Sequence, residues 1–118
     1  MRFEQISDNE ILDHQTGLVW RRDYKVGLTW EEALDYAKSL GDDWHLPTIE
    51  DLETLVNYKR SNPASDFPGM PPVGFGSSSS SVDYPGFAWY VNFYSGYVLY
   101  GNKTRTRNRN VRCVRSGP

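Results

Sequence analysis

FAWYVNFYSGYVLYGNKTRTRNRNVRCVR (residues 87–115) is the stretch from which the fold of this chain is predicted. Its first part alternates as a half-buried strand does, with Phe87, Trp89, Val91 and Phe93 on an apolar side. Ser95-Gly96 is a candidate tight turn, because Gly readily supplies the positive φ that such a turn needs. The segment is therefore predicted to open with a β-hairpin.

The other side of this hairpin is predicted to be displayed outward. With a two-residue loop, Tyr94 lies opposite Tyr97 and Asn92 lies opposite Leu99. The outward side then carries Tyr90, Asn92, Tyr94, Tyr97 and Leu99. Tyr and Asn are typical of antibody paratopes, where rigid amphipathic rings combine with adaptable hydrogen bonding. An ordinary solvated sheet face has the same composition, so both interpretations stand.

Beyond Tyr100 the core-facing apolar positions change from even to odd residue numbers. Val111 and Cys113 are the apolar positions of the predicted last strand, and continuing that strand backwards would turn three arginines into the core. These are Arg105, Arg107 and Arg109. Because desolvation of a charge is costly, residues 101–109 are predicted to be a loop, a bulge or an edge that turns away from the core.

Charge is unevenly distributed along the 118 residues, whose net charge is −2. Residues 1–100 carry seven Lys/Arg against all fifteen Asp/Glu, whereas residues 101–118 carry six Lys/Arg and no acid. A cationic end on an acidic body neither requires nor excludes a nucleic-acid partner. The length predicts one domain, residues 1–118, and the aromatic content of 14% favours sheets and binding surfaces.

Two helices are predicted ahead of these strands. Each opens with a capping-box pattern, in which a Thr is followed three residues later by an acid: Thr29 with Glu32, and Thr48 with Asp51. The first helix is expected to stop at Gly41, and the second near residue 59. Early helices followed by strands predict an α+β domain.

Two further segments complete the prediction. Residues 11–12 and 18–20 flank a loop that ends in Gly17, which indicates an N-terminal hairpin. Residues 61–86 are rich in Pro, Gly and Ser, including Ser77 to Ser81, and are predicted to form a long surface loop.

Signals for catalysis are few. His14 lies in a hairpin loop, His45 precedes Leu-Pro, and the serine run lacks the elbow motif of a serine nucleophile. The lone Cys113 is expected to be a small core residue. We therefore expect no enzymatic activity, no cofactor and no metal site.

Six motifs occur in the order and spacing of a known family: TGLVW (16–20), LTWEEALDYAKSL (28–40), WHLPTIEDLETLV (44–56), AWYVNF (88–93), SGYV (95–98) and VRCVR (111–115). Together they resemble the C-terminal domain of the Legionella collagen-like adhesin. The resemblance implies a C-type-lectin-like fold, with two short helices packed on a twisted antiparallel sheet and both termini close together. It also implies a non-enzymatic binding module. Such modules occur on adhesins, on phage and surface proteins, and as the variable proteins of diversity-generating retroelements.

The chain departs from this family in two respects. Many relatives carry a Cys near the position of Ala37, which could pair with the one matching Cys113, and this chain does not. Relatives often have Trp-Ser-Ser where residues 75–78 read Phe-Gly-Ser-Ser. The Glu-Pro-Asn and Trp-Asn-Asp patterns of calcium-dependent lectins are absent too, so their calcium chemistry is not expected here.

The predicted ligand site combines the outward side of the hairpin with the basic loop. It comprises Tyr90, Asn92, Tyr94, Tyr97, Leu99, Tyr100, Asn102, Lys103, Arg105, Arg107, Asn108 and Asn110. The expected ligand is a protein or a glycan. The alternative is a nucleic acid, with its phosphates along the Arg-rich loop 103–109 and its bases stacked on tyrosines. A solvated loop whose arginines meet the acidic body is a third interpretation.

Location and assembly are less constrained. No apolar signal segment opens the chain as given, which favours the cytoplasm or carriage on a larger particle or surface assembly. The longest uncharged run, residues 84–102, alternates with period two, so a membrane span is not expected. Oligomerisation remains open.

Overall fold

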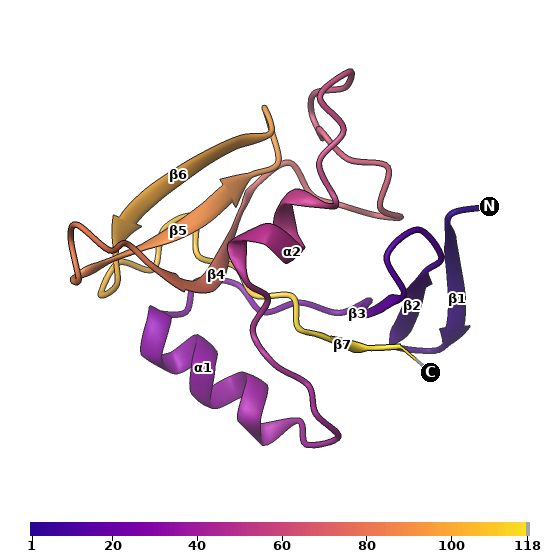
Figure 1. The fold of residues 1–118 in the computed structure, drawn as a ribbon, viewed down its shortest axis with the longest axis horizontal. Helices are drawn as coiled ribbons and strands as arrows, with labels where there is room; N and C mark the ends of the chain where they lie inside the picture. The colour runs from indigo at the N-terminus through magenta and orange to yellow at the C-terminus, as the bar shows by residue number, and fades with distance from the viewer. Residues whose placement is uncertain (118) are drawn as a thin grey trace.

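The computed structural model describes residues 1–117 and shows a small α+β domain, as predicted (Figure 1). The elements are β1 (Phe3–Ser7), β2 (Glu10–Asp13), β3 (Leu18–Arg21), α1 (Trp30–Ser39), α2 (Ile49–Glu53), β4 (Gly74–Ser80), β5 (Phe87–Asn92), β6 (Tyr97–Asn102) and β7 (Val114–Ser116). They form two antiparallel sheets, ordered β1-β2-β3-β7 and β4-β5-β6. The first and last strands of the chain thus share one sheet, which lies at the opposite end of the molecule from β6.

Both helices begin where the capping boxes predict. The Thr29 side chain accepts a hydrogen bond from the Glu32 backbone N–H, and the Glu32 carboxylate accepts one from the Thr29 N–H. Thr48 and Asp51 repeat this arrangement at α2. The reciprocal bonds satisfy backbone donors that have no partner inside the helix. Of the helices among residues 1–117, neither has the length and apolar character to cross a membrane.

The second helix ends earlier than predicted, at Glu53 rather than near residue 59. The backbone N–H groups of residues 55 and 56 bond to carbonyls three residues back, which tightens the last turn. The Thr54 hydroxyl also donates to the Asp51 carbonyl. Asn57 then donates its N–H to the Ala64 carbonyl, so the chain leaves the helix to pair with a later segment.

The serine run was wrongly predicted to be part of a loop, because residues 74–80 form strand β4. A Cβ atom at Gly74 would lie 2.6 Å from the Asn108 carbonyl oxygen, so only glycine permits that close approach. The buried Ser77 hydroxyl donates to the Trp89 carbonyl on β5, at 2.7 Å. Small residues are therefore required here by packing, although their strand propensity is low.

Two buried clusters hold the layers together. One joins α2 to both sheets and contains Phe3, Ile11, Trp20, Leu52, Leu55, Phe67, Met70, Phe75, Val91, Phe93 and Val114. The other packs α1 against the closing segment and contains Val19, Ala33, Ala37, Trp44, Leu46, Val111 and Cys113. The prediction that Cys113 is a core residue is confirmed, and burial raises the pKa of its thiol to about 11.

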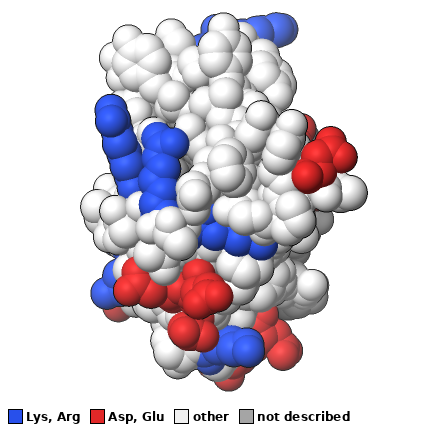
Figure 2. All heavy atoms as spheres, turned by 90° about the vertical axis from the view of Figure 1, so that its left-hand side faces the viewer, with Lys and Arg blue, Asp and Glu red and all other residues white. Residues whose placement is uncertain are grey.

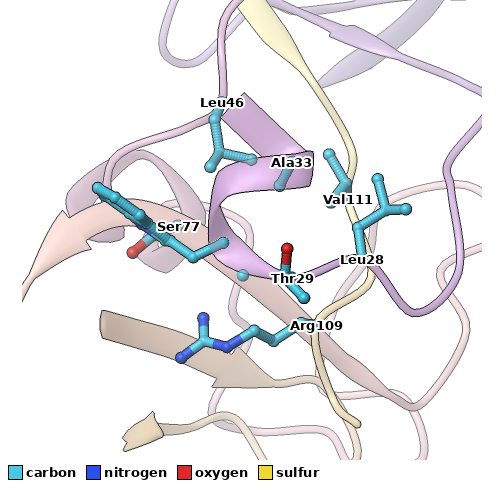
Figure 3. A pocket seen from close by; sticks show the side chains of 9 residues that line it. Leu28, Thr29, Ala33, Leu46, Ser77, Arg109 and Val111 are labelled. Atoms are coloured by element: carbon cyan, nitrogen blue, oxygen red, sulfur yellow. The ribbon is translucent and has the colours of Figure 1, made fainter. Parts of the chain in front are cut away.

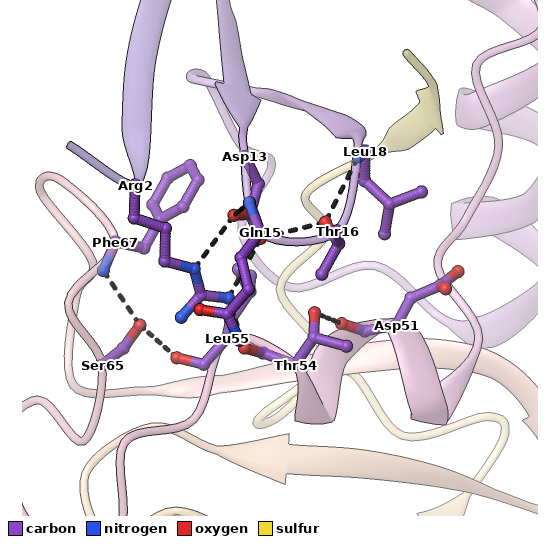
Figure 4. Close-up of polar contacts among 10 residues, drawn as sticks. All are labelled: Arg2, Asp13, Gln15, Thr16, Leu18, Asp51, Thr54, Leu55, Ser65 and Phe67. Atoms are coloured by element: carbon purple, nitrogen blue, oxygen red, sulfur yellow. Dashed lines mark hydrogen bonds and ion pairs between the residues drawn. The ribbon is translucent and has the colours of Figure 1, made fainter.

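A polar network connects the N-terminal sheet to α2 (Figure 4). The buried Asp13 carboxylate accepts two hydrogen bonds from the Arg2 guanidinium, at 2.9 and 3.0 Å. It also accepts bonds from the Gln15 N–H and the Thr16 hydroxyl. Arg2 donates in addition to the Thr54 carbonyl at the end of α2, 2.7 Å away.

Candidate ligand-binding face

The hairpin of β5 and β6 exists as predicted, but its loop has four residues rather than two. Asn92 pairs with Tyr97 and Tyr90 pairs with Leu99. The Phe93 N–H instead bonds to the Val73 carbonyl, and the Phe93 carbonyl accepts from Ala64, so Phe93 has no backbone group left for β6. The register therefore moves by two residues, which leaves the side chains of the paired residues 87–92 and 97–102 on the sides predicted for them, whereas Tyr94 lies in the turn.

We define the hairpin face as the side of β5 and β6 that carries Ala88, Tyr90, Asn92, Tyr97, Leu99 and Gly101. Tyr97 and Leu99 are exposed on it, at 68% and 38% of their surface. Asn92 is half-buried, and Tyr94 is exposed in the adjoining turn. Tyr90 was expected to be displayed, but only 7% of it is exposed.

Arg109 is the residue that covers Tyr90. Its guanidinium carbon lies 5.9 Å from the centroid of the Tyr90 ring. Its Nη2 donates to the carbonyls of Ala88 (3.0 Å) and Gly101 (2.6 Å), and its Nε donates to Asn102 at 3.3 Å. These carbonyls offset the desolvation of the charge.

The prediction that residues 101–109 all turn away from the core is thus wrong for Arg109, which is only 2% exposed. Burial, and after it the charge of Arg105, lowers the pKa of this guanidinium. Asn110 is also buried, at 8% exposure, although it was expected at the surface. Its side-chain oxygen accepts from the Gly27 N–H, and its backbone pairs with β4.

The rest of the basic loop borders the hairpin face. A Cβ atom at Gly101 would lie 3.5 Å from Arg105 Nη1, which places this guanidinium beside the face. Asn108 lies against Gly74 on the same side. Arg105 and Arg107 are exposed. Among residues 1–117, neither of these arginines forms an ion pair with a carboxylate.

Three of the predicted site residues lie away from the hairpin face. Tyr100 and Asn102 point to the opposite side of the sheet, as their pairing with Trp89 and Phe87 shows. Lys103 extends toward α1, where its Nζ lies 4.0 Å from the centroid of the Trp30 ring.

The opposite side carries an aromatic cluster that sequence reasoning missed. The rings of Tyr84 and Tyr100 stack with centroids 6.1 Å apart and planes 10° apart, and Trp89 meets Tyr100 edge-on at 5.2 Å. Phe87 completes the cluster. Tyr84 and Tyr100 are 58% and 46% exposed. The signal was present in the alternation of Phe87 and Trp89, but it was interpreted as a core-facing pattern.

Figure 2 views the molecule from the side on which the β4-β5-β6 sheet lies above α1. Long Lys and Arg side chains stand beside a broad uncharged surface, and acidic side chains gather below them. Cationic and uncharged areas are therefore adjacent on this side of the molecule.

The two histidines occupy other surroundings. His14 Nε2 lies 2.8 Å from the Glu4 carboxylate, and His45 Nδ1 lies 3.1 Å from the Asp43 carbonyl. Within residues 1–117, no three His, Cys, Asp or Glu side chains are grouped so that they could hold a metal ion.

The fold and this face define a small α+β domain that displays aromatic and basic side chains on a rigid hairpin. Residues 9–115 match the family described as the Lcl C-terminal domain, and the chain belongs to that family. At the family level it is an adhesin-like module. No curated protein matches the chain.

Proposed function

We propose that this chain is a non-enzymatic binding module that captures a protein or a glycan on the hairpin face. The observation that carries the proposal is the exposure of Tyr97 and Leu99 on the hairpin face. Arg105, which has no ion pair among residues 1–117, borders this face at Gly101, and Arg109 holds the base of the face. Large aromatic and aliphatic surface, a free cation and nearby amide groups are the components of a recognition surface.

Each group has a distinct contribution to binding. Tyr97 offers contact area with few rotatable bonds, so little conformational entropy is lost when a ligand covers it. Arg105 and Arg107 attract acidic groups and raise the association rate. Asn92 and Asn108 supply hydrogen-bond donors and acceptors. Because Arg109 bonds to carbonyls of both hairpin strands, the base of the site is formed before the ligand arrives.

A C-type-lectin-like fold is part of the proposal. Two helices packed against antiparallel sheets, and a first and a last strand that share a sheet, support it. An experimental structure that fails to superpose on C-type-lectin domains would contradict this part alone.

The site can be tested by screening the domain against a glycan array and a displayed-peptide library. A ligand found there should lose at least tenfold in affinity when Tyr97 and Leu99 are both replaced by Ala, because about 1.4 kcal/mol of contact energy would be removed. The matched control is Tyr84→Ala with Tyr100→Ala, on the opposite side, which should retain binding. Loss in the control pair alone would move the site to the aromatic cluster.

Within this function, we propose that the domain is diversified by a retroelement. The support is the family together with the position of the basic loop just ahead of the closing strand β7. A near-copy of the 3′ coding segment beside a reverse-transcriptase gene, differing at template adenines, is expected in the genome. Its absence would leave an undiversified binding module.

Nucleic acid is the second candidate ligand, because the exposed rings of Tyr84 and Tyr100 offer surfaces on which bases can stack, and the loop arginines can donate hydrogen bonds to phosphates. Affinity for single-stranded RNA and DNA should then fall steeply between low and moderate salt. An absence of binding at low salt would remove this candidate.

A further inference from the structure

The β4-β5-β6 sheet ends in β6, and the outer edge of this strand is not paired with another strand of residues 1–117 (Figure 1). The Trp89 carbonyl accepts from the Ser77 hydroxyl on β4, so it points away from Tyr100, the residue opposite on β6. Hydrogen-bonded and non-hydrogen-bonded pairs alternate along an antiparallel ladder, so Val98 is placed as Tyr100 is. The backbone N–H and C=O groups of Val98 and Tyr100 therefore point outward, and no residue among 1–117 bonds to them.

The two edges of the other sheet are protected against a further strand. On β7, Val114 exchanges both backbone hydrogen bonds with His45, each at 3.0 Å. On β1, the exposed Glu4 brings a charge, and the register shifts between Gln5 and Ser7. Covering segments, charges and bulges are devices by which proteins prevent pairing at a sheet edge.

The β4 edge of the same sheet is covered by the segment that precedes β7. The Gly76 N–H donates to the Asn110 carbonyl at 2.9 Å. Figure 3 shows Arg109 and Val111, which flank Asn110 in the sequence, beside Ser77 of β4, with which they line one small cavity.

Strand β6 lacks each of these protections. Its register with β5 is regular from Tyr97 to Asn102, and this segment contains neither a charged residue nor Pro. Tyr97, Leu99 and Tyr100 are exposed along it. Such an edge is a template for strand addition, in which main-chain hydrogen bonds give affinity and alternate side chains give specificity.

The charge beside this edge distinguishes between possible occupants. A residue added opposite Gly101 would lie on the hairpin face, with the two Cα atoms about 4.5 Å apart. Arg105 Nη1 lies 3.5 Å from the Cβ position of Gly101, and Arg105 has no ion pair among residues 1–117. An Asp or Glu at the added position would therefore be stabilised.

Two other occupants fit this edge less well. A second copy that pairs through its own β6 would bring a second basic loop and no acid from residues 84–117, which contain no Asp or Glu. A glycan has no peptide groups with which to pair the open N–H and C=O groups of Val98 and Tyr100.

We propose that the partner captured on the hairpin face is an extended acidic polypeptide segment that adds to the sheet alongside β6, an inference that rests on the proposed function. Its peptide groups pair with those of Val98 and Tyr100. Its alternate side chains extend the hairpin face, and an Asp or Glu opposite Gly101 pairs with Arg105.

The probes for the test are twelve-residue peptides enriched from a random displayed library and synthesised with blocked ends. A bound peptide should slow hydrogen exchange of the Val98 and Tyr100 N–H groups at least tenfold, as measured by NMR. N-methylation of the peptide at alternate positions should weaken binding by about tenfold or more in one set of positions, because each methyl removes a donor to β6. The other set points away from β6 and should change affinity by less than about twofold.

Two variants of the domain test the same contacts. Val98→Pro removes one outward N–H at an edge position that tolerates Pro, so the domain should fold and bind the peptides at least tenfold more weakly. Arg105→Gln should weaken binding about three- to tenfold, and only for peptides that carry an acid opposite Gly101. Arg22→Gln, at an exposed position just after β3, is the matched control and should bind as the native chain does.

Failure to enrich any peptide, or binding that leaves the exchange of Val98 and Tyr100 unchanged, would overturn strand addition. Protection of the same N–H groups by self-association of the domain would overturn it in favour of a second copy. In either case, a glycan or protein whose affinity depends on Tyr97 and Leu99 would still support the proposed function, so the two proposals can fail separately. If Val98→Pro does not fold, the N-methylated peptides on the native chain still decide.

Discussion

Two buried arginines show how this chain accommodates charge in its core. Arg109 is surrounded by carbonyls of the hairpin. Arg112 is equally buried, and its Nη1 donates to the carbonyls of Arg21 at 2.9 Å and Arg22 at 2.5 Å. Its guanidinium carbon lies 4.5 Å from the centroid of the Phe67 ring, and burial lowers its pKa to about 10. Planar, weakly hydrated guanidinium suits such carbonyl and aromatic surroundings.

We predict that Arg112→Met destabilises the domain by about 3 kcal/mol, because two carbonyls lose a charged donor. Urea unfolding followed by tryptophan fluorescence measures the change. Arg107→Met is the matched control at an exposed position and should change stability by less than about 0.5 kcal/mol. Equal effects of the two substitutions would contradict a structural role for Arg112.

At the scale of single elements, β4 and the basic loop depend on one another. Gly74 allows the Asn108 backbone to approach β4, and Gly76 lies beneath Arg109. Asn110, which directly follows the loop, pairs with β4, because Gly76 donates its N–H to the Asn110 carbonyl and the Asn110 N–H donates to the Gly74 carbonyl. The loop is therefore held along part of its length, although its arginines 105 and 107 remain exposed.

Gly74→Ala should destabilise the domain by roughly 1–3 kcal/mol, because the new Cβ would lie 2.6 Å from the Asn108 carbonyl oxygen. Displacement of the loop should also weaken binding of any ligand of the hairpin face. Gly86→Ala is the control, since nothing lies within 4 Å of its Cβ position. Thermal unfolding of both variants gives the comparison. Equal Tm values for Gly74→Ala and Gly86→Ala would show that the loop adjusts to the new Cβ without cost.

At the scale of the whole molecule, the sheet β1-β2-β3-β7 is joined to α2 by the Arg2–Asp13 network. Burial acts to raise the pKa of Asp13, but hydrogen bonds from Arg2, Gln15 and Thr16 outweigh it. The pKa of Asp13 in the folded state is therefore below 3.8, its value in an unperturbed chain. The stabilisation is complete above the unfolded pKa and is lost as pH falls through the folded one.

Asp13→Asn should therefore destabilise the domain at neutral pH by about 3 kcal/mol, because a partly buried guanidinium loses its counter-charge. The difference from the native chain should shrink as pH falls below 3.8, the pKa of Asp13 in the unfolded chain, and disappear below its lower pKa in the folded domain, where the native carboxylate is protonated too. Asp23→Asn, which removes a more exposed partner of Arg21, should cost at most about 1 kcal/mol. Urea unfolding at several pH values is the measurement, and a pH-independent difference would contradict the assignment.

The sequence by itself determined the features that depend on neighbouring residues. Thr29 and Thr48 begin their helices because the capping groups lie three residues away, and the alternation of β5 sets its two sides because successive side chains of a strand point oppositely. The order of six motifs determined the family.

Only the tertiary structure decided which parts of those sides are covered. Tyr90 is buried and Arg109 enters the core because carbonyls of Ala88 and Gly101 come together only after β5 and β6 pair. The serine run becomes part of a strand because its partners come from other segments: Ser77 donates to the Trp89 carbonyl, and Ser78 donates its backbone N–H to the Pro47 carbonyl. From the sequence alone, the desolvation cost of the charge excludes a buried arginine. In the folded domain, carbonyl acceptors from distant segments offset this cost and stabilise the buried guanidinium.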